Sequence, residues 1–523
     1  MEYTVIKIGE DIFDSLHACG LGILLATAGD TQVKIEDMGT YYRIYFGKNT
    51  LEQTGLEILN NVLALPTQDE VLKFGKDQTQ FSVALANFDG LLSALFTTRG
   101  PRLASVRDVI SKQKLSTTSV EDSLSKVIKF KNKLLNFAAQ KAKAPSILMI
   151  DILLDYSSIN PKIPSLNVKS GINNLNVLMT VAPAFSYSTR QPRSDGLVTH
   201  KTNISIAGTR YATLLAFVGA ARFLRTQRVS GNLVNYYVPL ANQITLEVNT
   251  TLPLLFPTEI ASVQAIIAQA LSYATDKRQS SDVAWKKLSY QTLQTQGALQ
   301  SISVDRGCFD LDWLTLIGKQ AGDKILSHWK SLLYKKRESI IFEIDNLLDC
   351  LKSQRLDNWL THLYEMSNLT LGVDKIRPYS FSEVKEISLM MSDAKDSLLT
   401  EIFGREKGTV RFGHALRLLG RYNFASLRDL TDALDCVQTR DQLLRSLAQL
   451  AQECTIASAK SQFIIVPDDE DLRQLLVDVE QNTARTIALL LIILASLRYP
   501  QVSNSEPNDT QASNSELVSS NAN

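Results

Sequence analysis

Strand-type sequence is confined to the first half of this chain, whereas the second half is a succession of helical patterns. The opening segments "YTVIKIG", "TQVKIEDMG" and "YYRIYF" alternate like half-buried strands around the helical "DIFDSLHACGLGILLATA". After about residue 280 the strand signals fade and segments with a helical period follow one another. This division predicts a mixed α+β protein, with an N-terminal α/β domain carrying basic loops, an all-α C-terminal helical bundle and a disordered tail.

The length of 523 residues requires more than one hydrophobic core. We expect an α/β domain over 1–280, a helical connector over 281–390, a C-terminal helical bundle over 391–500, and a tail over 501–523 that has almost no apolar residues. Within the first domain, 51–143 is expected to be mostly helical, "SILMIDILLDYSS" to be a strand, and about 208–228 to be a helix. Ser426 and Asp471 are plausible helix N-caps in the second half.

Two glycines lie within the first expected helix. Gly20 and Gly22 lower its intrinsic helix propensity. A glycine kept at that cost indicates that another backbone packs closely against the helix.

No catalytic or cofactor-binding signature is present in the sequence. There is no Walker A loop, no GxGxxG after a strand and no HExxH, and the five histidines and five cysteines lack metal-ligand spacing. We therefore expect no catalytic residue, no metal and no cofactor, although carboxylate pairs assembled from distant positions stay open.

The scattered cysteines and acidic N-terminus indicate a reduced, cytoplasmic protein. The longest apolar run near the end, 487–497, is too short to span a bilayer, so no membrane partner is expected.

The net charge of +1 gives no signal for a nucleic-acid partner, but basic residues cluster locally. Between Arg99 and Lys143 eleven basic residues stand against three acidic ones. Apolar residues at helical spacing among Lys126, Lys129, Lys131 and Lys133 predict an amphipathic helix with a cationic face. Such a face is either simply solvated or a surface for phosphate contact.

A second basic group surrounds the expected helix at about 208–228. Arg222, Arg225 and Arg228 lie within about 120° of one another on that helix, and the preceding segment adds Arg190, Arg193, Lys201 and Arg210. Planar guanidinium groups suit phosphate, so these residues either bind nucleic acid or pair with carboxylates elsewhere in the fold. In the neighbouring loop, Lys169, Asn173 and Asn174 are either turn residues or contacts to a DNA minor groove.

The helical half contains a third basic group. His414, Arg417 and Arg421 follow i, i+3, i+7 spacing, as on one stripe of a helical bundle, and Arg411 and Arg428 flank them. Such a stripe is able to follow a single-stranded backbone or to meet an acidic partner protein.

The chain resembles the large subunit, or Cas-eight family, of type I CRISPR surveillance complexes (Cascade). The resemblance is carried by the opening strand with "DIFDSLHACGLGILLATA" and by "TNISIAGTRYATLLAFVGAARFLRTQRVSGNLVNYYVPL", which are similar to type I-B-like members, including those of RNA-guided transposons. The layout extends to about Tyr499.

The resemblance implies a non-catalytic subunit with nucleic-acid and protein partners. The family's N-terminal part senses the protospacer-adjacent motif, helps to open the duplex and lies near the 5′ end of the guide RNA, while its helical part contacts displaced or target DNA. The implied partners are CRISPR RNA, target double-stranded DNA, the backbone, Cas-five-like and small Cascade subunits, and either a helicase-nuclease or a transposition adaptor. On this reading Asn173 and Asn174 sense the motif, and Arg417, Arg421 and Arg428 contact a DNA strand.

Two other functions stay open from the residues alone: a scaffold that binds only proteins, and a metal-dependent nuclease, which the missing ligand spacing disfavours.

Some family members release the helical part as a small subunit from an internal start. Met390 and Met391 offer such a start here, although ordinary core methionines explain them equally well.

Overall fold

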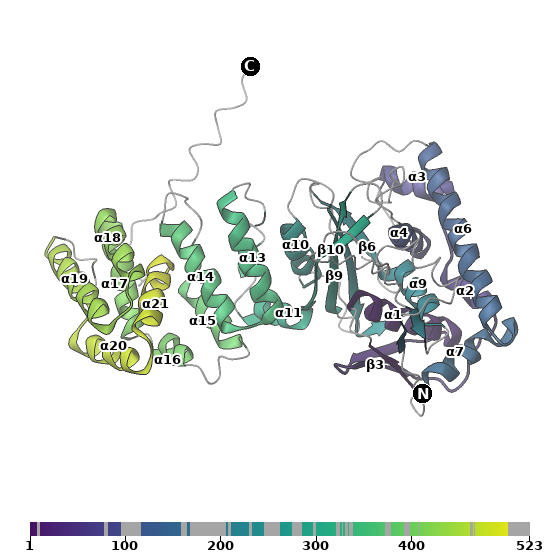
Figure 1. The fold of residues 1–523 in the computed structure, drawn as a ribbon, viewed down its shortest axis with the longest axis horizontal. Helices are drawn as coiled ribbons and strands as arrows, with labels where there is room; N and C mark the ends of the chain where they lie inside the picture. The colour runs from purple at the N-terminus through teal and green to yellow at the C-terminus, as the bar shows by residue number, and fades with distance from the viewer. Residues whose placement is uncertain are drawn as a thin grey trace, which may run out of the picture. The chain divides into compact units, whose positions relative to one another are not determined.

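The chain forms two compact units, Met1–Leu316 and Ile317–Asn523, in a computed structural model (Figure 1). The residues that the structure describes are 1–7, 11–77, 82–95, 117–157, 165–167, 205–207, 211–229, 233–244, 262–274, 285–296, 300–320, 325–326, 328–329, 333, 338–371, 378–391, 398–405, 407–460, 464 and 466–499. The tail over 501–523 lies outside them. The first unit mixes helices with antiparallel sheets and the second is helical, which confirms the predicted mixed α+β class.

The first unit begins as its sequence pattern predicts. Strand β1 (Glu2–Ile6), helix α1 (Asp11–Gly29) and strands β2 (Val33–Asp37) and β3 (Tyr41–Phe46) follow in order. They form an antiparallel sheet of order β1-β3-β2-β8, completed by the short β8 (Gln243–Ile244). Because β3 lies between β1 and β2, this is a split β-α-β unit with α1 against one face of the sheet.

Where the structure describes residues 51–143, the regular elements are all helices, as expected. The helices are α2 (Glu57–Val62), α3 (Gln68–Asp77), α4 (Val83–Leu95) and α6 (Thr117–Lys141). The segment "SILMIDILLDYSS" was predicted as a strand, and that prediction is wrong: it forms the 3-10 turn η1 (Pro145–Ile147) and helix α7 (Leu148–Tyr156). Its isoleucines favour a strand locally, but Met149 and Ile152 are buried while Ile150 is exposed, as on a helix with one packed face.

A second antiparallel sheet has the order β10-β9-β7-β6. Its strands are β6 (Arg225–Arg228), β7 (Leu233–Ala241), β9 (Trp285–Gln296) and β10 (Gln300–Asp310). The hairpin of β9 and β10 corrects the expectation of a purely helical connector over 281–390. The boundary between the two units, at residue 316, also lies inside that expected connector.

The described residues of the first unit include two more helices and a small two-stranded sheet. Helices α9 (Ala212–Phe223) and α10 (Ser262–Ala274) are both buried along most of their length, and β4 (Ser165–Asn167) pairs with β5 (Ser205–Ala207) in a separate small sheet. The chain from β7 to β8 takes part in both larger sheets, because β7 pairs with β9 and β8 pairs with β2.

Glycine-mediated contacts hold the helical core of this unit together. A Cβ atom added to Gly20 of α1 would lie 1.8 Å from the Leu215 carbonyl oxygen of α9, and one added to Gly219 would lie 2.0 Å from the Leu16 oxygen. A Cβ on Gly90 of α4 would lie 2.2 Å from two carbonyl oxygens of α9. The predicted close approach at Gly20 is therefore confirmed. An 18-residue window of α1 is apolar enough to cross a membrane by length and composition, but 94% of it is buried inside this unit.

The second unit contains one helix after another. From α11 (Leu311–Gln320), which crosses the boundary, they are α13 (Glu338–Ser353), α14 (Leu356–Leu371), α15 (Phe381–Met390), α16 (Leu398–Arg405), α17 (Thr409–Tyr422), α18 (Phe424–Asp435), α19 (Arg440–Ser458), α20 (Asp469–Gln481) and α21 (Ala484–Ser496). The expected caps are each displaced by three residues: Asn423 caps α18 and Asp468 caps α20, while Ser426 and Asp471 supply the N3 amides that these caps bind.

The residues after α21 bind back onto the start of α15. The Arg498 amide donates to the Tyr379 carbonyl oxygen at 2.8 Å, and the Phe381 amide donates to the Arg498 carbonyl oxygen at 2.9 Å. The Tyr499 ring stacks on Phe381, with centroids 5.2 Å apart, and on His414, at 3.9 Å. These contacts join residues on both sides of the boundary expected at 390.

Candidate nucleic-acid interface

Helix α6 presents a polar stripe along its exposed side. At 100° per residue, positions 122, 126, 129, 133, 136 and 140 fall within about 80° of one another. The opposite side is buried and consists of Val127, Phe130, Leu134 and Phe137. The predicted amphipathic helix is thus present, with its apolar face packed and Lys126, Lys129 and Lys133 on the outer side, but Lys131 does not share that side.

The lysines of this stripe differ in their partners. Lys126 pairs with Asp122 one turn earlier, at 2.6 Å, whereas Lys129 and Lys133 are exposed and have no carboxylate partner in the part of the chain that the structure describes. Lys131 lies on the other side of the helix, where its Nζ donates to the Asn60 carbonyl oxygen at 3.4 Å and burial lowers its pKa. Two positive charges, at 129 and 133, therefore remain available to an anionic ligand.

Arg222 and Arg225 do not lie on an exposed cationic face. Arg222 is 6% exposed and donates to the Val62 carbonyl oxygen at 3.5 Å, and burial together with the nearby Arg225 charge lowers its pKa to about 10. Arg225 is 2% exposed, donates to the carbonyl oxygens of Arg222 and Leu224 at 2.7 Å, and pairs with the buried Asp89 carboxylate at 3.5 Å. For these two residues the alternative reading, pairing inside the fold, is the one that the structure supports.

The expected helix over 208–228 explains the error. Helix α9 ends at Phe223, and residues 225–228 form β6, which pairs with β7. A strand turns successive side chains to opposite faces, so the three arginines do not share a helical face. Arg228 belongs to β6.

The remaining predicted residues of the first unit lie outside the described residues. These are Lys169, Asn173, Asn174, Arg190, Arg193, Lys201 and Arg210.

The three predicted arginines of the second unit have different environments. The Arg417 Nη1 donates to the carbonyl oxygens of Ala495 and Ser496, at 3.5 and 3.1 Å, and so caps the C-terminus of α21. Arg421 is exposed at the end of α17. Arg428 is exposed on α18 and forms a long i,i+4 pair with Asp432, at 3.9 Å. Arg417 is thus structural, whereas Arg421 and Arg428 remain accessible.

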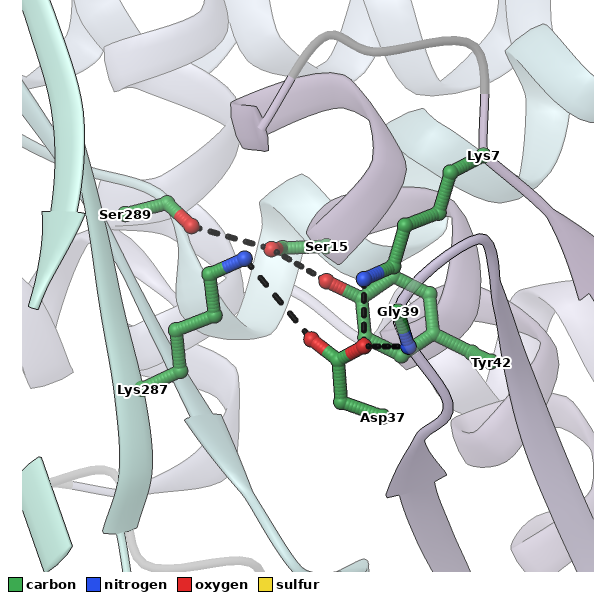
Figure 2. A network of polar contacts seen from close by, with 7 residues as sticks. All are labelled: Lys7, Ser15, Asp37, Gly39, Tyr42, Lys287 and Ser289. Carbon is green, nitrogen blue, oxygen red and sulfur yellow. Dashed lines mark hydrogen bonds and ion pairs between the residues drawn. The ribbon is translucent and has the colours of Figure 1, made fainter. Parts of the chain in front are cut away.

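A polar network joins the two sheets of the first unit, as Figure 2 shows. Asp37 at the end of β2 accepts from Lys7 and from the Gly39 amide, and its second oxygen lies 3.7 Å from the Lys287 Nζ of β9. The Lys7 ammonium lies 4.3 Å from the centroid of the Tyr42 ring, whose hydroxyl is 3.2 Å from the Ser15 hydroxyl. Ser15 in turn lies 3.1 Å from the Ser289 hydroxyl of β9. This group was not predicted from the sequence, because its members come from four separate segments and form no motif.

A cavity of about 760 Å³ lies beside this network. It is lined by Lys34, Ile35, Glu36, Asp37, Met38, Leu240, Asn242, Lys286, Lys287, Cys308, Phe309, Asp310 and Asp312. Its lysines are already paired, Lys34 with Glu36 at 2.6 Å and Lys286 with Asp312 at 2.5 Å. With four carboxylates against three ammonium groups, the formal charge of the lining is negative, whereas the α6 stripe is cationic.

Within the described residues, no three or more His, Cys, Asp or Glu side chains are gathered as a metal site requires. Comparison of the sequence with protein-family models and with curated proteins found no match.

Proposed function

We propose that the chain is a non-catalytic, nucleic-acid-binding subunit of an RNA-guided DNA-targeting complex of the CRISPR Cascade type. The observation that carries this proposal is the α6 stripe on a firmly packed helix, where Lys129 and Lys133 are exposed and no described residue offers them a carboxylate partner. The rise of an α-helix separates them by about 6 Å along the axis. Two ammonium groups at this spacing suit adjacent phosphates of one strand. Contacts to phosphates supply most of the affinity with which a protein binds nucleic acid independently of its sequence.

In this role the protein binds guide RNA and target DNA while base pairing reads the sequence. Its N-terminal unit contributes to recognition of the protospacer-adjacent motif, to binding of the guide 5′ end and to duplex opening, and Arg421 and Arg428 of the second unit contact the displaced or target strand. The predicted basic residues outside the described part of the chain belong to the same proposal.

The test is binding of a target duplex, measured against salt concentration, by the complex reconstituted with CRISPR RNA and the neighbouring subunits. The double change Lys129→Ala and Lys133→Ala is expected to weaken binding and to reduce the slope of log K against log salt by about 1.8, two phosphates' worth. The matched control is Lys48→Ala with Lys286→Ala, two lysines of the same unit that already pair with Glu52 and Asp312. Equal slopes for the two double variants would contradict a role of α6.

Failure to form any RNA-containing complex would contradict the assignment to a guided system. Duplex and single-strand binding by the isolated full-length chain then decides whether the protein binds nucleic acid at all.

A second candidate function, a scaffold for protein partners, has one observation in its favour. Ile147, Ile150 and Leu154 form an exposed apolar stripe along η1 and α7, with 38%, 43% and 60% of their surfaces exposed. Such a stripe at i, i+3 and i+7 suits a partner helix. Ile150→Asp with Leu154→Asp, measured by co-purification with the neighbouring subunits, separates this function from nucleic-acid binding.

A further inference from the structure

The outer face of the first sheet carries a row of aromatic and cationic side chains. In the central strand β3 every second residue is buried, namely Tyr42, Ile44 and Phe46. The alternate residues Tyr41, Arg43 and Tyr45 point to the other face and are partly exposed. Side chains two residues apart on a strand lie about 7 Å from each other, so the row spans about 14 Å.

Arg43 holds the two tyrosines in place. Its guanidinium donates to the Tyr45 hydroxyl at 3.0 Å and to the Tyr41 hydroxyl at 3.1 Å, and its central carbon lies 5.9 Å from the centroid of each ring. Its Nε lies 3.1 Å from a Glu2 carboxylate oxygen on β1. The rings are thus fixed before any ligand arrives, which reduces the entropic cost of binding to them.

The charges around this row cancel. Arg43 is balanced by Glu2, and Lys34 on β2 is balanced by Glu36, at 2.6 Å. The face therefore offers aromatic surface without net attraction for phosphate, in contrast to the α6 stripe. Nucleobases are planar and stack on tyrosine and guanidinium groups whatever their sequence, and sheet-based RNA-binding modules place aromatic residues on a sheet face for this purpose.

We propose that Tyr41, Arg43 and Tyr45 form a stacking platform for two unpaired bases of a single-stranded nucleic acid. The inference rests on the proposed function, because it takes nucleic acid as the partner. It goes further by assigning different contacts to two surfaces of the first unit. The α6 lysines bind backbone phosphates, and the β3 row binds unpaired bases, either from an opened duplex or from a single strand.

The experiment measures binding of labelled single-stranded DNA and RNA oligonucleotides of identical sequence to the full-length chain, by fluorescence anisotropy. Tyr41→Ala and Tyr45→Ala are each expected to weaken binding by about 5- to 150-fold, the range for loss of one stacked base. Tyr41→Phe and Tyr45→Phe keep the ring but lose the bond to Arg43, so they are expected to weaken binding much less than the alanine variants do. The salt dependence should be the same for all four variants, since none removes a positive charge.

A second measurement links the platform to the bases themselves. For the unchanged protein, abasic sites in place of successive bases should weaken binding of the oligonucleotide. For the double variant Tyr41→Ala, Tyr45→Ala, oligonucleotides with abasic sites should bind no more weakly than intact ones. If the loss of affinity from the abasic site and the loss from the double variant simply add, the proposal is overturned, because two changes that remove the same contact are not additive. A loss restricted to RNA would identify the guide as the ligand, and one restricted to DNA the displaced strand.

Three results separate the platform from the function on which it rests. If the alanine variants bind like the unchanged protein while Lys129→Ala with Lys133→Ala weakens binding, the platform is wrong and the function stands. If neither set has an effect, both are wrong. If the phenylalanine variants are as weak as the alanine variants, the hydroxyl contacts to Arg43 matter rather than stacking, and the platform is again wrong. Far-UV circular dichroism on each variant verifies that the sheet is intact.

Discussion

The close contact between α1 and α9 in the first unit gives a sharp test of the fold. We consider Gly20→Ala, with Gly22→Ala as the matched control two residues away on the same helix. At Gly20 the new Cβ would meet backbone, with the Leu215 carbonyl oxygen at 1.8 Å and its carbon at 2.6 Å. At Gly22 it would meet only side-chain ends, the Cδ1 atoms of Ile244 and Ile35 at 3.0 Å. Side-chain ends are able to rotate aside, whereas two packed helices must separate.

The expected magnitudes follow from two opposing contributions. Overpacking of a core costs about 1–3 kcal/mol, and a backbone contact belongs at the upper end, about 3. Replacing a helical glycine by alanine stabilises the helix by about 1 kcal/mol, because alanine has the higher helix propensity. Gly20→Ala should therefore destabilise the first unit by about 2 kcal/mol, whereas Gly22→Ala should be neutral or stabilising by up to about 1 kcal/mol.

Hydrogen exchange with mass spectrometry is the assay of choice, because it follows peptides of α1 and α9 without interference from the second unit. A loss of about 2 kcal/mol accelerates exchange of their most protected amides about 30-fold. Equal protection in the two variants, or faster exchange in Gly22→Ala, would refute the view that the backbones of α1 and α9 touch at Gly20.

Three further predictions concern an ion pair, a stacked ring and a buried histidine. Asp89→Ala leaves the Arg225 charge buried without its carboxylate and should cost about 3–5 kcal/mol in urea denaturation, and a change below about 1 kcal/mol would contradict the pairing. Tyr499→Ala removes a half-buried ring stacked on Phe381 and His414 and should cost the second unit about 2–3 kcal/mol, below the range for a fully buried aromatic, whereas Tyr499→Phe, which loses only the bond to the Leu494 oxygen, should cost about 1 kcal/mol by thermal denaturation. Burial lowers the pKa of His17 to about 3, from about 6.5 in an unfolded chain. Between these values the unfolded chain binds a proton that the folded chain does not, so stability should fall as pH drops from 6.5 to 3, and His17→Phe should make that dependence shallower.

The sequence was most informative where the pattern is local. Alternation in "YYRIYF" predicted β3 and the two faces of its sheet, because the period of a strand needs only neighbouring residues. The buried face of α6 followed in the same way from Val127, Phe130 and Leu134. Gly20 pointed to a close helix partner, although it did not identify α9 as that partner.

The failures involve partners far along the chain. Nothing near Arg225 indicates that Asp89 of α4 will lie 3.5 Å away, so its burial was not predictable from its own segment. No glycine or proline marks the end of α9 at Phe223, and the strand after it depends on pairing with β7. Likewise "WKKLSYQTLQTQ" has strand character only because β10 and β7 lie on either side of it. Tertiary contacts override weak local preferences at such places.

The first sheet is completed by residues that are synthesised late. Helix α1 ends at Gly29 and its partner α9 begins at Ala212, about 180 residues later, and β8 follows only at residue 243. At about 5–20 residues per second, a ribosome needs about 10–40 s to cover that interval. During this time an apolar helix, later one of the most buried in the protein, has no α9 to pack against. We therefore expect nascent chains to engage a ribosome-associated chaperone through α1 until α9 has emerged from the ribosome, and expression yield to depend on translation speed upstream of α9.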